Sequence, residues 1–226
     1  FINNITHEFN TPLANINMAN SLLQKSEAVA KSDKLLNYTC IIDSEKQRLL
    51  EHTQAILNLS KFEQNPNYCC NLEPTFPDQL IGQAIENFKL TIQARNGQIK
   101  LNSNSKNIQI PLNQTHFLNA ICNIIDNAVK YSTTQPEIVI DTNVYDNYLE
   151  ISLSDKGIGI PPADLPHVFE RYFRVHTGDI HNVKGFGIGL TYVKRVADEH
   201  CGTIRIESIV NKGRSEERRV GKDCRP

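Results

Sequence analysis

Apolar residues recur at intervals of three and four along the first 23 positions, which is the pattern of an amphipathic helix. They are Ile2, Ile5, Phe9, Leu13, Ile16 and Leu23. After a polar break at 25–34, a second segment repeats apolar residues at strict seven-residue intervals, at Leu35, Ile42, Leu49 and Ile56. Such a repeat is typical of the seam of a left-handed helix bundle. Two helices of this length cannot bury both apolar faces alone, so we expect residues 1–63 to form a helical hairpin that completes a four-helix bundle as a homodimer.

The rest of the chain mixes helical and strand patterns. Residues 64–77 contain three prolines and no periodicity, which indicates a linker. Further helices are predicted at 78–94, 114–131 and 190–199, the second of them capped by Asn113. Short or alternating apolar segments predict strands at 99–101, 108–110, 138–144, 148–153 and 203–207. We therefore expect an α+β protein in which the hairpin is followed, at 78–213, by a two-layer α/β sandwich.

Composition and charge narrow the classes of partner. The chain is 39% hydrophobic and 22% charged with a net charge of −1, so no nucleic acid is expected as a partner. It contains no apolar run near the length of a membrane span, and we expect no membrane contact in this piece. The six cysteines form no CxxC pair and no metal-ligand spacing with histidines, which predicts free thiols. Because the chain begins at Phe1 inside a helical pattern, we expect it to be a fragment of a longer protein.

The first helix contains an unusual string from Thr6 to Leu13. At about 100° per residue, His7 lies roughly 160° from Phe9 and therefore off the apolar stripe. Thr11 returns to within about 40° of His7, so the imidazole and the hydroxyl share a face. Pro12 provides no N–H for the preceding turn and is expected to bend the helix there. A lone surface histidine on a bundle helix is the simpler interpretation of this string alone.

The predicted helix at 114–131 carries a polar face beside its apolar stripe. Asn123, Asn127, Lys130 and Tyr131 fall at i, i+4, i+7 and i+8, which places them together. Two amide oxygens could bind Mg²⁺, an ammonium could bind phosphate, and an aromatic ring could pack on a base. A solvated helix face is the alternative for this string.

Three further strings could also contact a nucleotide. Asp155, Gly157 and Gly159 follow a strand, where glycines allow a planar amino group to approach the backbone while the aspartate accepts its hydrogen bond. Residues 168–174 combine aromatic rings with arginines and end at Arg174. The third string precedes a helix and exposes N–H groups suited to phosphate; it contains Gly185, Gly187, Gly189 and Leu190. It follows no strand, so a dinucleotide-binding fold is excluded. Taken singly, these strings are also compatible with a turn, a surface helix and a glycine-rich loop.

In this order the five strings resemble the H-box, N-box, DxGxG, F-box and GxGxGL motifs of bacterial two-component sensor histidine kinases, and the resemblance covers residues 1–213. It implies an ATP-binding domain of the histidine-kinase, gyrase and chaperone type, with ATP and Mg²⁺ as cofactors. Asn127 and Asn123 would hold Mg²⁺ and phosphates, and Lys130 would contact phosphate. Tyr131 would pack on adenine, and Asp155 would bind the adenine amino group. The remaining positions would shape the pocket: Gly157, Gly159, Gly185, Gly187, Gly189 and Leu190.

The resemblance also implies a reaction and partners. His7 would be phosphorylated from ATP, Glu8 would orient its ring, and Arg174 would approach the γ-phosphate. The phosphoryl group would pass to an aspartate of a response regulator receiver domain, and Thr11 would serve a phosphatase activity by orienting water. The chain would be the cytoplasmic portion of a membrane-anchored sensor. Two alternatives remain, a non-catalytic nucleotide-binding dimeric scaffold and an ATPase of the wider superfamily.

The last residues depart from the family pattern. Residues 214–226 contain one branched apolar residue and no alternation, so we expect no strand there. The segment resembles a translated sequencing adapter and is expected to be a non-native tail. The sheet would then lack its last strand and expose an edge.

Overall fold

The computed structural model describes residues 2–64, 71–105, 108–146, 148–175, 187–210 and 213–221. In some helical and strand segments only the backbone is described, namely at 2–11, 47–48, 51–52, 54–64 and 213–221. The chain divides into two compact units, 1–66 and 67–226. The division falls inside the predicted linker, and each unit is described by itself.

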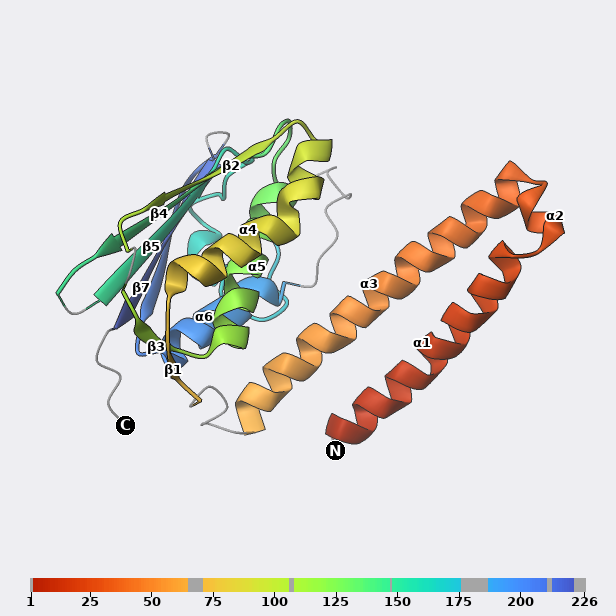
Figure 1. Ribbon diagram of the computed structural model, residues 1–226, viewed down its shortest axis with the longest axis horizontal. Coiled ribbons are helices and arrows are strands. Elements are labelled where there is room, and N and C mark those ends of the chain that lie inside the picture. Colours follow the sequence, from red (N-terminus) through yellow and green to blue (C-terminus); the bar gives the residue numbers. More distant parts are fainter. Residues whose placement is uncertain are drawn as a thin grey trace. The chain divides into compact units, whose positions relative to one another are not determined.

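The first unit is a helical hairpin, as predicted (Figure 1). Its helices are α1 (Ile2–Gln24), the single-turn α2 (Glu27–Ala30) and α3 (Asp33–Gln64). Helix α2 lies in the predicted polar break, where α1 and α3 reverse direction. Helix α1 continues through Pro12 without interruption.

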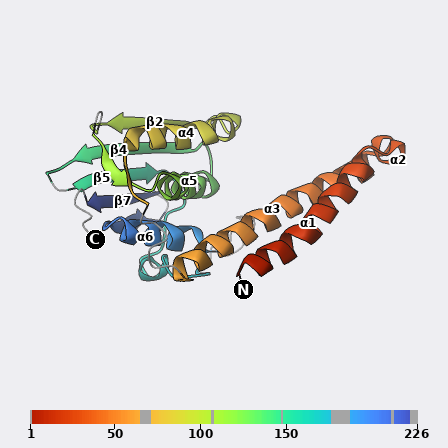
Figure 2. The ribbon, with the colours of Figure 1, turned by 60° about the horizontal axis from the view of Figure 1, so that its bottom comes forward.

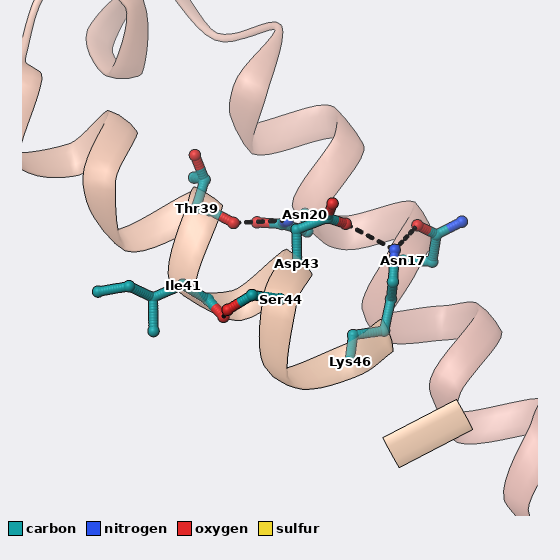
Figure 3. Close-up of polar contacts among 7 residues, drawn as sticks. All are labelled: Asn17, Asn20, Thr39, Ile41, Asp43, Ser44 and Lys46. Carbon is teal, nitrogen blue, oxygen red and sulfur yellow. Dashed lines mark hydrogen bonds and ion pairs between the residues drawn. The ribbon is translucent and has the colours of Figure 1, made fainter. Parts of the chain in front are cut away.

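Polar side chains join the two long helices (Figure 3). Asn20 is only 3% exposed, and its Nδ2 donates to the Thr39 carbonyl at 2.9 Å. Lys46 Nζ on α3 donates to Asn17 Oδ1 on α1 and to Asp43 Oδ1, both at 2.6 Å. Because these contacts join specific turns, they set the axial register of α1 against α3.

The second unit is a sheet covered on one face by three helices (Figures 1 and 2). The helices are α4 (Pro77–Ala94), α5 (Gln114–Lys130) and α6 (Gly189–Glu199), with a 3-10 turn η1 (Leu165–His167). The five-stranded sheet has the order β2-β4-β5-β7-β6 and comprises β2 (Gln98–Ser103), β4 (Glu137–Val144), β5 (Tyr148–Asp155), β7 (Gly213–Gly221) and β6 (Thr203–Ile209). Strands β2 and β4 are parallel, and the other neighbours are antiparallel. This arrangement confirms the predicted two-layer sandwich.

The core lies between the sheet and the helices. Alternate residues of β4 and β5 are buried, as a sheet covered on one face requires. Ile140 and Leu149 are fully buried in these strands, and Phe117, Ile121 and Ile125 bring the apolar face of α5 against the sheet. The opposite face of α5 is therefore left for polar residues.

A hydrogen bond between two capping residues, Asn113 and His200, joins the start of α5 to the end of α6. Asn113 Oδ1 accepts from the His116 N–H at 3.1 Å, which confirms the predicted helix cap. The Asn113 N–H donates to His200 Nε2 at 3.0 Å, and His200 Nδ1 lies 2.7 Å from the Val196 carbonyl. Since one ring nitrogen accepts and the other must donate, His200 is the neutral Nδ1–H tautomer. This residue ties the C-terminal end of α6 to the N-terminal end of α5.

The expectation that residues 214–226 form no strand is wrong for 214–221. Strand β7 pairs with β5 from Tyr148↔Gly221 to Asp155↔Arg214, and with β6 on its other side. Pairing uses backbone N–H and C=O groups, which every residue except proline carries in full, so a segment between two open strand edges can pair without apolar alternation. Strand β7 therefore occupies an interior position between β5 and β6, and the edges of the sheet are β2 and β6.

Two smaller expectations also change. The predicted linker contains a strand, β1 (Glu73–Thr75), which pairs antiparallel with β3 (Ile110–Leu112). Cys40 and Cys122 are free, but Cys201 is disulfide-bonded. Free thiols were thus wrongly expected at Cys201, because local spacing excludes only local pairs. Among the described residues, no helix combines the length and apolarity needed to cross a membrane.

Candidate functional site

The polar face of α5 meets the N-terminus of α6. Asn123 and Asn127 are half-buried, and Gly189 is the first residue of α6. A Cβ atom on Gly189 would lie 3.2 Å from Asn123 Oδ1 and 3.8 Å from Asn127 Nδ2. The two predicted amides therefore face the end of a helix whose dipole favours anions.

The C-terminal end of α5 meets the loop that follows β5. The Ile158 N–H donates to the Tyr131 carbonyl at 3.1 Å. Asp155 is 6% exposed, and its Oδ1 accepts from the Gly157 N–H at 2.8 Å. A Cβ on Gly157 would lie 2.7 Å from Asp155 Oδ1 and 3.0 Å from the Tyr131 carbonyl, so only glycine leaves the carboxylate in place.

The aromatic and arginine string is held against the glycines before α6. The Tyr172 N–H donates to the Gly187 carbonyl at 3.0 Å. Gly187 has φ +68°, and a Cβ there would lie 2.4 Å from the Phe173 carbonyl oxygen. Thr191 Oγ1 donates to the Phe169 carbonyl at 3.0 Å. The string leads from these anchors to Arg174, whose side chain is exposed.

These contacts bring together four strings that are separate in the sequence. The amides of α5, the glycines before α6 and the segment before Arg174 meet at the N-terminus of α6, and the loop with the carboxylate after β5 contacts the C-terminal end of α5. The arrangement can bind phosphates at the helix end and an amino group at the buried carboxylate. It is the kind of site that a nucleotide requires.

Lys130 has a partner that the sequence analysis did not include. Its Nζ lies 2.5 Å from Asp126 Oδ2, one turn earlier on α5, and both side chains are more than a third exposed. Asp126 therefore holds the ammonium on the same face as the amides. The sequence could have indicated this ion pair, because an acid and a base four residues apart on a helix lie on the same face.

The donor atoms fit a magnesium ion shared with phosphate. Asn123 Nδ2 donates to the Asn119 carbonyl at 2.8 Å, which turns Oδ1 towards Gly189. Within the described part of the chain, no cluster of three or more His, Cys, Asp or Glu could hold a metal ion without a substrate. Mg²⁺ is commonly bound by a few protein oxygens together with substrate phosphates, so the amide set is suitable.

A buried histidine lies between the same two helices. His116 Nδ1 is 2.8 Å from the Tyr192 hydroxyl. Burial lowers the pKa of His116 below its usual value, so the neutral ring is favoured. Sequence reasoning missed His116, Thr191 and His200, because none lies within a motif.

Some predicted site residues lie outside this description. Helix α1 includes His7, Glu8 and Thr11, but their side chains are not described. Gly185 lies outside the described residues. The roles of these four residues remain predictions.

Comparison with known proteins gives two domain matches. Residues 1–65 match the His Kinase A (phospho-acceptor) domain, and residues 112–220 match the histidine kinase-, DNA gyrase B- and HSP90-like ATPase domain. The second match extends through nearly all of β7.

Relatives match over most of this chain. Sensor protein RprX of Bacteroides fragilis is 38% identical over 94% of this chain and 41% of its own length. Sensor histidine kinase WalK of Bacillus subtilis is 30% identical over 94% of this chain and 35% of its own length. The chain thus spans well under half of these relatives.

Solved structures share the fold. Full-length ShkA in complex with AMPPNP gives a TM-score of 0.82 at 18% identity, covering 100% of this chain and 46% of that one. The histidine kinase ThkA in complex with response regulator protein TrrA gives 0.68 at 17% identity, covering 97% and 60%. A helical hairpin followed by an α/β ATPase unit is common to them.

Proposed function

The chain belongs to the two-component sensor histidine kinases, and we propose that it phosphorylates His7 from ATP and passes the phosphoryl group to an aspartate of a response regulator receiver domain. The observation that carries this proposal is the meeting of the α5 amides with Gly189 at the start of α6. A phosphoacceptor domain matched in the same chain favours a kinase over an ATPase of the wider superfamily or a non-catalytic scaffold.

The proposed nucleotide contacts all come from the second unit. The Asp155 carboxylate accepts a hydrogen bond from the adenine amino group, and its Oδ1 also accepts one from the Gly157 N–H. Tyr131 packs on the base. Lys130, whose Nζ contacts Asp126 one turn earlier on α5, binds phosphate. Asn123 and Asn127 would hold Mg²⁺, and the bound ion would neutralise charge on the phosphates.

The phosphoryl transfer uses residues of both units. A neutral ring nitrogen of His7 attacks the γ-phosphorus; an N–P bond forms as the bond to the ADP oxygen breaks. Glu8 accepts a hydrogen bond from the other ring N–H and stabilises the positive charge that develops. Arg174 stabilises charge on the group in transfer. In a separate phosphatase reaction, Thr11 orients a water molecule that attacks the phospho-aspartate of the response regulator, which releases inorganic phosphate and restores the aspartate.

The hairpin supports a homodimer. Leu35, Ile42 and Leu49 of the predicted seam remain 41%, 40% and 50% exposed in the single chain. A second copy that covers this seam completes a four-helix bundle. We place the chain in the cytoplasmic part of a membrane-anchored sensor. The complex of ThkA with a response regulator is a precedent for the proposed partner.

The first experiment locates the phosphoryl group. The purified chain is incubated with γ-labelled ATP, and an acid-labile, base-stable label is expected. His7→Ala abolishes the label and leaves ATP affinity unchanged, whereas His52→Ala, at the other histidine of the first unit, retains the label. Label retained in His7→Ala contradicts the proposal.

The second experiment tests the nucleotide site. Asp155→Asn keeps the shape but removes the charge, so affinity for ATP and ADP is expected to fall about ten- to a hundredfold, the range for a hydrogen bond to a charged group. Isothermal titration measures both affinities. Unchanged ADP affinity would exclude Asp155 from the adenine contact.

A further inference from the structure

One threonine on α6 fastens the segment that leads to Arg174. Thr191 Oγ1 donates to the Phe169 carbonyl at 3.0 Å, across 22 positions of sequence. Lys194, one turn later on α6, places its Nζ 5.7 Å from the centroid of the Phe169 ring. Helix α6 therefore contacts both the backbone and the ring of the same residue.

The segment before Arg174 has little regular structure of its own. It follows the short turn η1, and Tyr172 adopts φ +63°, a conformation that is uncommon for a residue with a side chain. The described bonds that hold it to the glycine string and α6 are Tyr172 N–H to Gly187 and Phe169 carbonyl to Thr191. Its position thus depends on external anchors.

The same helix also faces the phosphate-binding amides. Gly189, two residues before Thr191, lies against Asn123 and Asn127. Phe169 is five residues before Arg174. Thr191 therefore links the part of the site suited to phosphate with the segment that carries the arginine.

We propose that Thr191 is a positioning residue for phosphoryl transfer, whose hydroxyl fixes the Phe169 backbone and thereby places Arg174 against the γ-phosphate. The inference rests on the proposed function, because it assigns Arg174 to the transferred group. It predicts an effect on transfer and none on the binding of ADP, which has no γ-phosphate.

The kinetic test compares two substitutions at one position. Thr191→Val keeps the shape and removes the hydroxyl, and its rate of His7 phosphorylation at saturating ATP is expected to fall about three- to tenfold, the range for one neutral hydrogen bond. Thr191→Ser restores the hydroxyl and the rate. ADP affinity stays within about twofold in both. Thr75→Val removes a hydroxyl that bonds to the Glu73 carbonyl in β1, far from the motifs in sequence, and serves as the matched control.

A second arm separates positioning from general destabilisation. In an Arg174→Ala background, Thr191→Val is expected to cause no further loss of rate, because its effect passes through the missing side chain. Equal losses in both backgrounds, or failure of Thr191→Ser to restore the rate, would overturn the inference.

A third measurement does not require kinase activity. Hydrogen exchange of the Tyr172 N–H is expected to accelerate in Thr191→Val and to be normal in Thr191→Ser. If the unchanged chain fails to phosphorylate His7, the proposed function fails, while this exchange still decides whether the Thr191 hydroxyl anchors the segment before Arg174. Unchanged exchange in Thr191→Val rejects this anchoring.

Discussion

Gly159 gives the sharpest test of the nucleotide loop. It follows β5 with φ +72°, and a Cβ atom there would lie 2.3 Å from the Ile209 carbonyl oxygen and 2.9 Å from Val210 Cα. Both neighbours are backbone at the end of β6, so they cannot rotate away. The adjacent Ile160 N–H donates to Ser208 Oγ at 2.8 Å, which holds the loop against that strand.

The cost of Gly159→Ala has two parts. A left-handed conformation costs a residue with Cβ about 1–2 kcal/mol. Forcing the loop and β6 apart costs roughly 1–3 kcal/mol, the usual range for overpacking. For a unit of this size, the sum of about 2–5 kcal/mol lowers the melting temperature by about 4–20 °C.

Gly82 is the matched control. It lies inside α4, and nothing lies within 4 Å of the Cβ that alanine would add. Gly82→Ala is therefore expected to stabilise the unit by about 0.5–1 kcal/mol through helix propensity alone. The same chemical change thus has opposite signs at two positions.

The assay is calorimetric melting of the full chain, followed by ATP titration of each variant below its transition. Gly159→Ala is expected to melt earlier and to bind ATP more weakly, and Gly82→Ala to melt later with ATP affinity unchanged. A melting temperature for Gly159→Ala equal to or above that of the unchanged chain would refute the reasoning.

Two further predictions concern the buried histidine and the hairpin. The pKa of folded His116 lies below the unfolded value of about 6.5, so the unfolded chain takes up the proton first and the free energy of unfolding falls as the pH drops below about 6.5. Urea unfolding at pH 7.5 and 5.5 should show that the free energy of unfolding falls less in His116→Gln than in the unchanged chain. An equal fall in both proteins contradicts this. Ile42→Glu places a charge on the exposed seam and should convert a dimer to a monomer in sedimentation, whereas Asn37→Glu, an exposed residue off the seven-residue repeat, should not. A dimeric Ile42→Glu would place the interface elsewhere.

Periodicity predicted the elements that bury a continuous face. The helices beginning at Pro77 and Gln114 and strands β4 and β5 follow their patterns closely, because each presents one apolar side to a shared core. Strand β1 was missed because three residues with a central proline give no alternation. Its pairing with β3 depends on where the neighbouring segments bring the backbone.

The site was predictable where a motif lies on a helix and less so where it lies in a loop. The i, i+4 spacing placed Asn123 and Asn127 on one face before the structure showed what they face. The bond from Thr191 to Phe169 joins a helix to an irregular segment, and no periodicity relates the two. Residue types in a sequence indicate what a site can bind, whereas the anchors that hold its loops depend on the tertiary structure.

The geometry of the nucleotide site depends on the alignment of α5 and α6 over the whole length of α6. At one end Gly189 meets Asn123; at the other, about 16 Å away along an 11-residue helix, His200 binds the Asn113 N–H. A shift of α6 along α5 would separate Gly189 from the amides and at the same time stretch the hydrogen bond between His200 and Asn113. Because α6 also holds Phe169 through Thr191, such a shift would move the segment before Arg174 as well. The buried end of α6 therefore contributes to the placement of the phosphate end, although it contains no family motif.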